Sequence, residues 1–170
     1  MDDRRRRFEA EALPHLDAAY NLARWLSRSP SDADDIVQDA MLRAFRAFDG
    51  FRGGDIKPWL LTIVRNCWRN RGRDVRRRNH APLPEDDAAL PSADPDPEAF
   101  AAQASDGRRL DTLIALLPND FREVLILREM EDLSYREIAD VTGTPIGTVM
   151  SRLARARAML KDKWLAEDRV

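Results

Sequence analysis

The fold of this chain is decided by residues 133–157, which read LSYREIADVTGTPIGTVMSRLARAR. Ser134, followed three residues later by Glu137, forms a capping box that predicts the start of a short helix. A glycine then supplies a turn, Thr144 is the expected N-cap of a second helix, and Pro145 suits its first helical position. Two helices joined by a short turn with glycine match the bihelical unit that reads duplex DNA.

The second helix of this unit divides into two faces at 100° per residue. One face is apolar and is expected to pack in a core: Ile146, Val149, Leu153, Ala156 and Leu160. The other face carries the candidate readers of duplex DNA: Thr148, Ser151, Arg152 and Arg155. Guanidinium groups fit guanine edges and phosphates, and short hydroxyl side chains let the helix approach closely. Arg157 borders the apolar stripe and is expected to be structural or directed at phosphate. The alternative is an amphipathic helix with a solvated basic face, and the ordered cap, turn and Thr-Pro start weigh against it.

Outward from this unit the whole chain predicts helices, because proline and glycine fall between periodic segments and no stretch alternates like a strand. Before it, we expect a helix ending near Ser27, one starting at Ser31 and running to about 48, and one from Pro58 to about Arg77. In the C-terminal part we expect helices over about 108–117, 120–130, 134–141 and 145–164. The predicted fold class is all-α.

The charge distribution divides the 170 residues into three blocks. Residues 1–80 hold 17 Lys and Arg against 12 Asp and Glu, and residues 108–170 hold 11 of each kind. Between them, residues 81–107 hold seven acids, no base and five of the ten prolines, so they are expected to form an extended linker. The predicted organisation is two small helical domains, 8–80 and 108–167, joined by an acidic, proline-rich linker over 81–107.

The composition excludes several classes of protein. With Cys67 as the one cysteine and two distant histidines, neither a disulfide framework nor a cysteine or histidine metal site is expected. The longest apolar runs fall far short of a membrane helix, and the N-terminus lacks a leader-like apolar segment. We therefore expect a cytoplasmic protein with no cofactor, no metal, no small-molecule substrate and no membrane contact of its own.

The helix over 58–78 combines an arginine stripe with aromatic and amide side chains. The candidate residues for single-stranded nucleic acid are Trp59, Arg65, Asn66, Arg69, Asn70 and Arg73. Arginines neutralise phosphates, aromatic faces stack on unstacked bases, and amides read base edges. The alternative is that Trp59 and Trp68 are packing residues and that the arginines only form a solvated face or a helix-end charge bias.

An acidic helix over 32–48 has Asp35, Gln38, Asp39, Arg43 and Arg46 on its polar face. By composition alone this is an ordinary bundle helix with mixed surface charge.

The order of these elements resembles the bacterial sigma factors of RNA polymerase. Four stretches resemble conserved region 2: Asp34–Ala40, Phe51–Gly53, Pro58–Leu60 and Ile63–Asn66. Three stretches resemble region 4: Leu127–Met130, Leu133–Ala139 and Gly147–Arg157. The similarity is closest to the extracytoplasmic-function, or group IV, sigma factors, which hold only these two domains and a linker.

The resemblance implies roles that the residues alone do not show. It implies that Asp35, Gln38 and Asp39 contact the clamp coiled coil of core RNA polymerase. It implies that residues 51–57 and the next helix capture a base flipped from the −10 non-template strand, with Asn66 in the pocket. It implies that the helix at 145–158 reads the −35 major groove through Ser151, Arg152 and Arg155. Met150 stands where many relatives carry a basic residue.

The resulting hypothesis is a promoter-specificity subunit without chemistry of its own, whose partners are core RNA polymerase, promoter DNA and a sequestering anti-sigma factor. The alternative is a stand-alone helix-turn-helix regulator that binds duplex operator without polymerase. An enzyme is the least supported reading, because the sequence contains no paired carboxylates, triad or phosphate loop in a suitable frame.

Overall fold

The computed structural model describes residues 2–78 and 106–169, and these residues contain helices and no strand. The first group of helices is α1 (Asp2–Ala12), α2 (Leu16–Ser27), α3 (Pro30–Ala47) and α4 (Ile56–Arg78), with 3₁₀ turns at Leu13–His15 and Phe48–Gly50. The second group is α6 (Asp106–Ala115), α7 (Asn119–Glu129), α8 (Tyr135–Thr142) and α9 (Ile146–Glu167). The all-α prediction is confirmed. Most of the predicted linker lies outside the described residues, but α6 begins at Asp106, inside the range assigned to it.

The first group differs from the sequence prediction at three helix starts, and one of them is α4, which begins at Ile56 rather than at Pro58. Ser29, and not Ser31, is the N-cap of α3, because its hydroxyl accepts a hydrogen bond of 3.3 Å from the Asp32 amide. Helix α1 was not predicted, yet it belongs to this group through Phe8, whose buried ring meets the Phe45 and Phe48 rings edge-on. Helix α2 ends at Ser27 as expected.

The second group contains the predicted bihelical unit, with one correction. The Ser134 hydroxyl accepts from the Glu137 amide at 3.1 Å, and Gly143 ends α8 in the left-handed conformation at φ 67°. Pro145, however, is the extended N-cap residue of α9 rather than its first helical residue. Thr144 instead shares a hydrogen bond of 2.8 Å with the Thr142 hydroxyl, so its hydroxyl tightens the turn.

The apolar stripe of α9 packs as predicted except at its first residue. Val149, Leu153 and Ala156 are buried, and Leu160 packs against the core from a half-buried position. Ile146 is 40% exposed, because it stands at the open end of the helix, one turn before the first buried residue.

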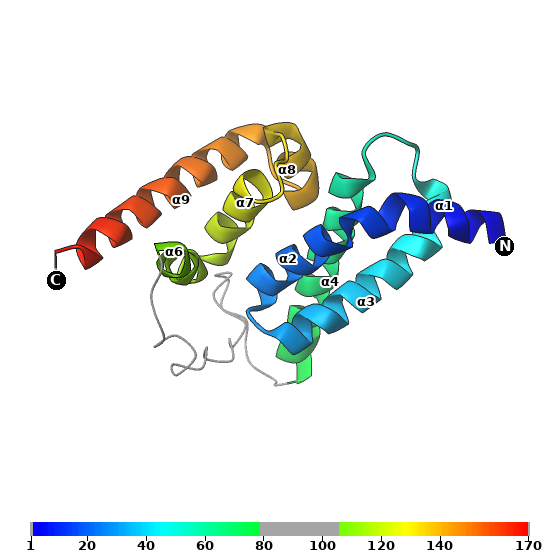
Figure 1. Ribbon diagram of the computed structural model, residues 1–170, viewed down its shortest axis with the longest axis horizontal. Helices are drawn as coiled ribbons and strands as arrows, with labels where there is room; N and C mark the ends of the chain where they lie inside the picture. Colours follow the sequence, from blue (N-terminus) through cyan, green and yellow to red (C-terminus); the bar gives the residue numbers. More distant parts are fainter. Residues whose placement is uncertain (1, 79–105, 170) are drawn as a thin grey trace.

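The two groups of helices lie side by side and share one continuous hydrophobic core (Figure 1). Helix α2 packs against α7, and α4 packs against α8. The N-terminus lies at the outer end of the first group and the C-terminus at the far end of α9, as Figure 1 shows. Within 2–78 and 106–169, none of the helices has the length and apolar content that a membrane span needs.

Candidate nucleic-acid interface

The polar face of α9 is presented to solvent. Ser151 and Arg155 are exposed and Thr148 is half-buried. The Ser151 hydroxyl donates to the Thr148 carbonyl at 3.0 Å, which holds this short side chain close to the helix. The face therefore combines short side chains, which let the helix approach DNA closely, with the exposed guanidinium of Arg155. Both features suit a helix that binds in the major groove.

Arg152 occupies a different position from the other candidate readers. Its guanidinium lies 3.5 Å from the Asp120 carboxylate of α7, and its side chain is only 24% exposed. Arg157 pairs with Glu129 at 2.6 Å, which fits the structural role expected for it. Only part of the predicted reading face is thus available without breaking an internal contact.

The arginine stripe of α4 forms one face, as the spacing predicted. Arg65, Arg69, Arg73 and Arg76 line a small pocket together with Asn119, Asp120 and Glu123 of the second group. Asn66, Asn70 and Arg73 are exposed, and Arg69 is half-buried. The amides and the outer arginines are accessible to a nucleic acid, but the inner part of the stripe faces carboxylates.

Arg65 differs most from its predicted setting. Its side chain is 8% exposed and forms an ion pair, with two hydrogen bonds, to Glu123 of α7, whose side chain is 2% exposed. Burial raises the pKa of Glu123, and the Arg65 charge opposes that rise without cancelling it. Arg65 is therefore a buried contact between the two groups of helices rather than a member of an open basic face.

The two tryptophans of α4 have different environments. Trp68 is buried in the core, as the packing alternative predicted for it. Trp59 is half-buried, and its ring lies 5.2 Å from the Phe51 ring, centroid to centroid. The Phe51 ring in turn stacks on Phe48, so an aromatic row leads from the core to the loop before α4.

The three candidate polymerase contacts of α3, Asp35, Gln38 and Asp39, are divided between two faces. Asp35 pairs with Arg71 at 3.2 Å, and Asp39 pairs with Arg43 at 3.1 Å, both beside α4. Gln38 points the other way and lines a groove between α1, α2 and α3.

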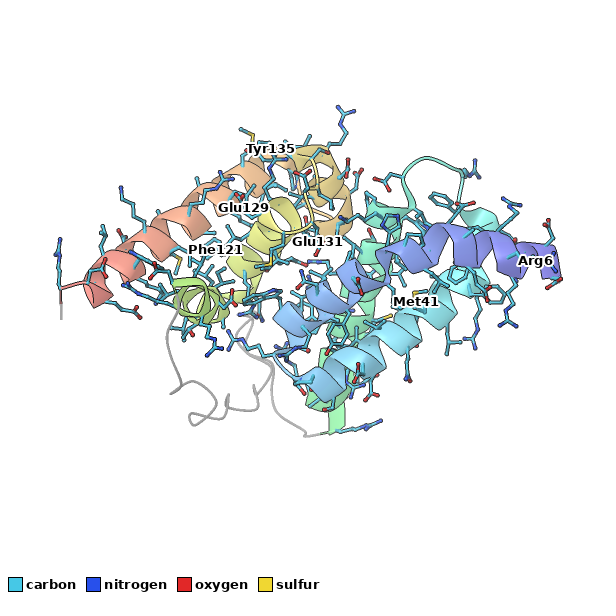
Figure 2. All side chains as sticks on the ribbon, viewed as in Figure 1. Arg6, Met41, Phe121, Glu129, Glu131 and Tyr135 are labelled. Atoms are coloured by element: carbon cyan, nitrogen blue, oxygen red, sulfur yellow. The ribbon has the colours of Figure 1, made fainter. Side chains whose placement is uncertain are left out.

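This groove, of about 890 Å³, is mainly apolar. Its walls include Leu13, Leu16, Tyr20, Met41 and Leu42. Leu16 and Tyr20 of α2 are both more than a third exposed, because their side of the helix opens into the groove. Figure 2 labels Met41 on α3.

Sequence reasoning missed the residues that join the two groups. Glu131 accepts a hydrogen bond of 2.7 Å from the Asn21 side chain and one of 2.8 Å at its backbone carbonyl from Lys57. Figure 2 shows Glu131 between the two groups. Glu123 and Glu131 are both buried. No sequence signal marked Glu123, because α7 also carries Asp120, Arg122, Arg128 and Glu129.

No group of three metal-ligating side chains occurs in the described parts of the chain. Cys67 is buried, and this burial raises the pKa of its thiol to about 11.

Two family descriptions match the chain, in the order of its two groups of helices. Residues 13–78 match "Sigma-70 region 2", and residues 107–160 match "Sigma-70, region 4".

Relatives of known identity match along most of the chain. The ECF RNA polymerase sigma-E factor of Haemophilus influenzae is 37% identical over 151 residues, which cover 84% of this chain and 78% of that protein. The ECF RNA polymerase sigma factor SigE of Mycolicibacterium smegmatis is 36% identical over 148 residues, which cover 87% of this chain and 58% of that protein. The chain thus spans less than two thirds of SigE.

Solved structures share the fold. The sigma factor RpoE of Bartonella quintana was solved in complex with the anti-sigma factor NepR. It matches this chain with a TM-score of 0.69 at 32% identity, and the match covers 91% of this chain and 94% of RpoE. CnrH, solved with the cytosolic domain of CnrY, also has a TM-score of 0.69, at 24% identity. At this identity, the similarity shows only that the two chains share a fold.

Proposed function

The chain belongs to the extracytoplasmic-function (ECF) sigma factors, and from this premise we propose that it binds core RNA polymerase and directs it to specific promoters. The observation that carries the proposal is the presence, in one fold, of a solvent-facing helix suited to duplex DNA and a second helix with arginine, amide and aromatic groups suited to a separated strand. We assign the first group of helices, α1 to α4, to the −10 and polymerase-binding domain and the second group, α6 to α9, to the −35 domain, with the linker between Arg78 and Asp106.

For the −35 element, α9 enters the major groove with Thr148, Ser151 and Arg155 toward the bases. Arg155 is the main reader, because it is exposed and its forked donors match a guanine edge. Arg152 contributes after it exchanges the Asp120 carboxylate for DNA.

For the −10 element, α4 and the loop before it hold the separated non-template strand. Asn66 and Asn70 read base edges, Arg69 and Arg73 neutralise phosphates, and the row formed by Phe51 and Trp59 offers aromatic surface. Arg65 can contact the strand only when its ion pair with Glu123 breaks.

The groove between α1, α2 and α3 is the proposed docking site for core polymerase. It combines apolar side chains with Gln38, the mixture expected at the core of a protein–protein interface. Glu9, Asp17 and Asp34 supply negative charge along the groove. Asp35 and Asp39 lie outside it, on the α4 side of α3, and would contact the polymerase there.

We further propose a cytoplasmic specificity subunit that has no chemistry of its own and is held inactive by an anti-sigma factor. The RpoE relative was solved with such a partner, which supports this part of the proposal.

The proposal is tested by mixing the full chain with purified bacterial core polymerase and a promoter duplex. Gel filtration is expected to show co-elution with core, and a gel shift is expected to show specific duplex binding only when core is present. Tight, specific duplex binding by the chain alone would favour the stand-alone regulator instead.

A matched pair of variants tests the docking groove in the same experiment. Leu42→Asp places a charge in the groove at a residue that is 57% exposed, so it is expected to abolish co-elution without unfolding the chain. Leu165→Asp changes a comparably exposed leucine at the far end of α9 and is expected to leave co-elution intact. Equal behaviour of the two variants would remove the groove from the proposal.

A further inference from the structure

A small pocket lies between α4 and the start of α7, and guanidinium groups form much of its wall. Along α4, four arginines at spacings of three or four residues line it from one helix face: Arg65, Arg69, Arg73 and Arg76. The cavity of about 60 Å³ has room for about four water molecules, or for one tetrahedral group of four oxygens. The pocket is therefore too small for a base or a sugar, but large enough for one small anion.

The charges of this pocket do not balance. The Arg65 guanidinium is paired with Glu123, and the Asp120 carboxylate lies 3.5 Å from Arg152 of α9. The other three arginines of the pocket form no ion pair with any residue in 2–78 or 106–169, although the charge of Arg69 opposes the rise that burial causes in the pKa of Glu123. Like charges three or four residues apart on a helix repel one another. An anion that these arginines can contact together would remove that repulsion.

A buried hydrogen-bond donor beside these arginines lacks an acceptor. Trp68 lines the pocket and is only 8% exposed, and its indole N–H has no hydrogen-bond partner among the described residues. An indole N–H can only donate, so the group that would satisfy it must carry an acceptor such as an anionic oxygen. The pocket also lies at the first turn of α7, where the positive end of the helix dipole favours negative charge. The arginines, the buried donor and the helix start all indicate an anionic ligand.

We propose that this pocket binds one phosphate group with two negative charges, supplied by inorganic phosphate or by the end of a nucleotide. A guanidinium presents two parallel N–H donors that match two phosphate oxygens, so several guanidiniums around one cavity suit a doubly charged group. A phosphate inside a DNA strand fits less well, because it carries one charge and continues into a sugar on both sides, for which the cavity has no room. The proposal needs only the pocket between α4 and α7, and it goes beyond the promoter role proposed above.

The test measures the binding of inorganic phosphate and of adenosine monophosphate to the full chain by isothermal titration calorimetry, at one ionic strength set with sodium chloride. Saturating phosphate is also expected to raise the midpoint of thermal unfolding, because a ligand that binds only the folded chain stabilises it. Binding of phosphate alone would support the proposal with the free anion as ligand, and tighter binding of adenosine monophosphate would support it with a nucleotide as ligand.

Three variants of the full chain locate the binding site. Arg76→Gln removes one guanidinium of the pocket and is expected to weaken phosphate binding at least about tenfold. Trp68→Phe keeps an aromatic ring in the core but removes the N–H, and is expected to weaken binding about two- to tenfold. Arg77→Gln makes the same change of charge at the next residue, which is exposed and does not line the pocket, so it is the matched control and is expected to leave binding unchanged.

Three results would overturn the site. The first is that neither probe binds or raises the unfolding midpoint beyond the effect of sodium chloride. The second is equal weakening by Arg76→Gln and Arg77→Gln, which would mean general attraction to the basic end of α4. The third is that a folded Trp68→Phe variant binds phosphate as tightly as the native chain, which would place the anion outside the pocket. If Trp68→Phe does not fold, the two arginine variants still decide the question. None of these measurements uses core polymerase or promoter DNA, so their outcome is independent of the proposed function.

Discussion

Arg152 of α9 lies 3.5 Å from Asp120 of α7, so one of the residues proposed to contact DNA is already engaged by a carboxylate of the neighbouring helix. The reason is its position beside the apolar stripe, where α7 packs against α9. Arg155, three residues later, is exposed and has solvent around it. The two arginines are therefore not equivalent, although the sequence places them on one face.

Replacement of Arg155 by alanine is expected to cost about 1–3 kcal/mol in promoter binding by the reconstituted holoenzyme and to relax discrimination at one −35 position. Arg152→Ala is expected to cost less, because part of its interaction with DNA is offset by the lost Asp120 contact. Competition between −35 variants in run-off transcription measures both. A larger effect for Arg152→Ala would reverse the assignment.

Asp120→Asn is expected to strengthen holoenzyme binding to −35 duplex by up to about fivefold, because a partly exposed ion pair is worth about 0.2–1 kcal/mol and its loss frees Arg152. The same change in an Arg152→Ala background is expected to have a smaller effect. An equal gain in both backgrounds would show that the carboxylate acts on DNA without Arg152.

Asn66→Ala is expected to reduce promoter opening while leaving −35 duplex affinity unchanged. The amide is exposed and is proposed to contact a separated base, and the loss of one hydrogen bond corresponds to about 0.5–1.5 kcal/mol. Permanganate reactivity of −10 thymines in the holoenzyme complex measures the effect. If the variant only weakens duplex binding, the residue has a different role.

Ser134→Ala is expected to lower the free energy of unfolding by about 1 kcal/mol, since the hydroxyl accepts from the Glu137 amide at the start of α8. Ser151→Ala, at an exposed mid-helix position of α9, is expected to leave stability nearly unchanged. Urea unfolding followed by circular dichroism compares the two. Equal losses would mean that the cap does not stabilise α8.

Cys67 provides a pH-dependent reporter of the core. Burial raises the pKa of its thiol to about 11, so the thiolate is scarcer in the folded chain than in the unfolded one. A thiol reagent at about pH 8 is expected to label the chain slowly until urea unfolds it.

The direction of the pH effect on stability follows from the same shift. A raised folded-state pKa contributes stability that is fully present below the unfolded value of 9.0 and is lost as the pH rises toward 11. The free energy of unfolding is therefore expected to fall more steeply above pH 9.0 in the native chain than in Cys67→Ala. Equal labelling of folded and unfolded chains would contradict the buried position.

Local patterns accounted for much of this fold. The Ser134 cap, the Gly143 turn and the stripe of Val149, Leu153 and Ala156 are each determined by residues within two or three turns of one another. Helix α1 was not predicted because four consecutive arginines, Arg4–Arg7, dominate its sequence and Phe8 is its one aromatic residue. The position of the helix depends on contacts of Phe8 with Phe45 and Phe48, which lie far along the chain.

The contact between the two domains was beyond the reach of such patterns. Arg65 and Glu123 are 58 residues apart, and each by itself resembles a surface charge on an amphipathic helix. Only the packing of α2 on α7 and α4 on α8 brings them together and excludes water from the pair. Periodicity predicts which face of a helix is apolar, but not which partner covers it.

The most direct test of the central claim is run-off transcription by purified core polymerase over a promoter library, with and without the full chain. We predict that the chain confines initiation to a subset of templates that share a −35 and a −10 sequence, and that this selection is lost when either element is scrambled. Initiation no more selective than that of core alone would contradict the account.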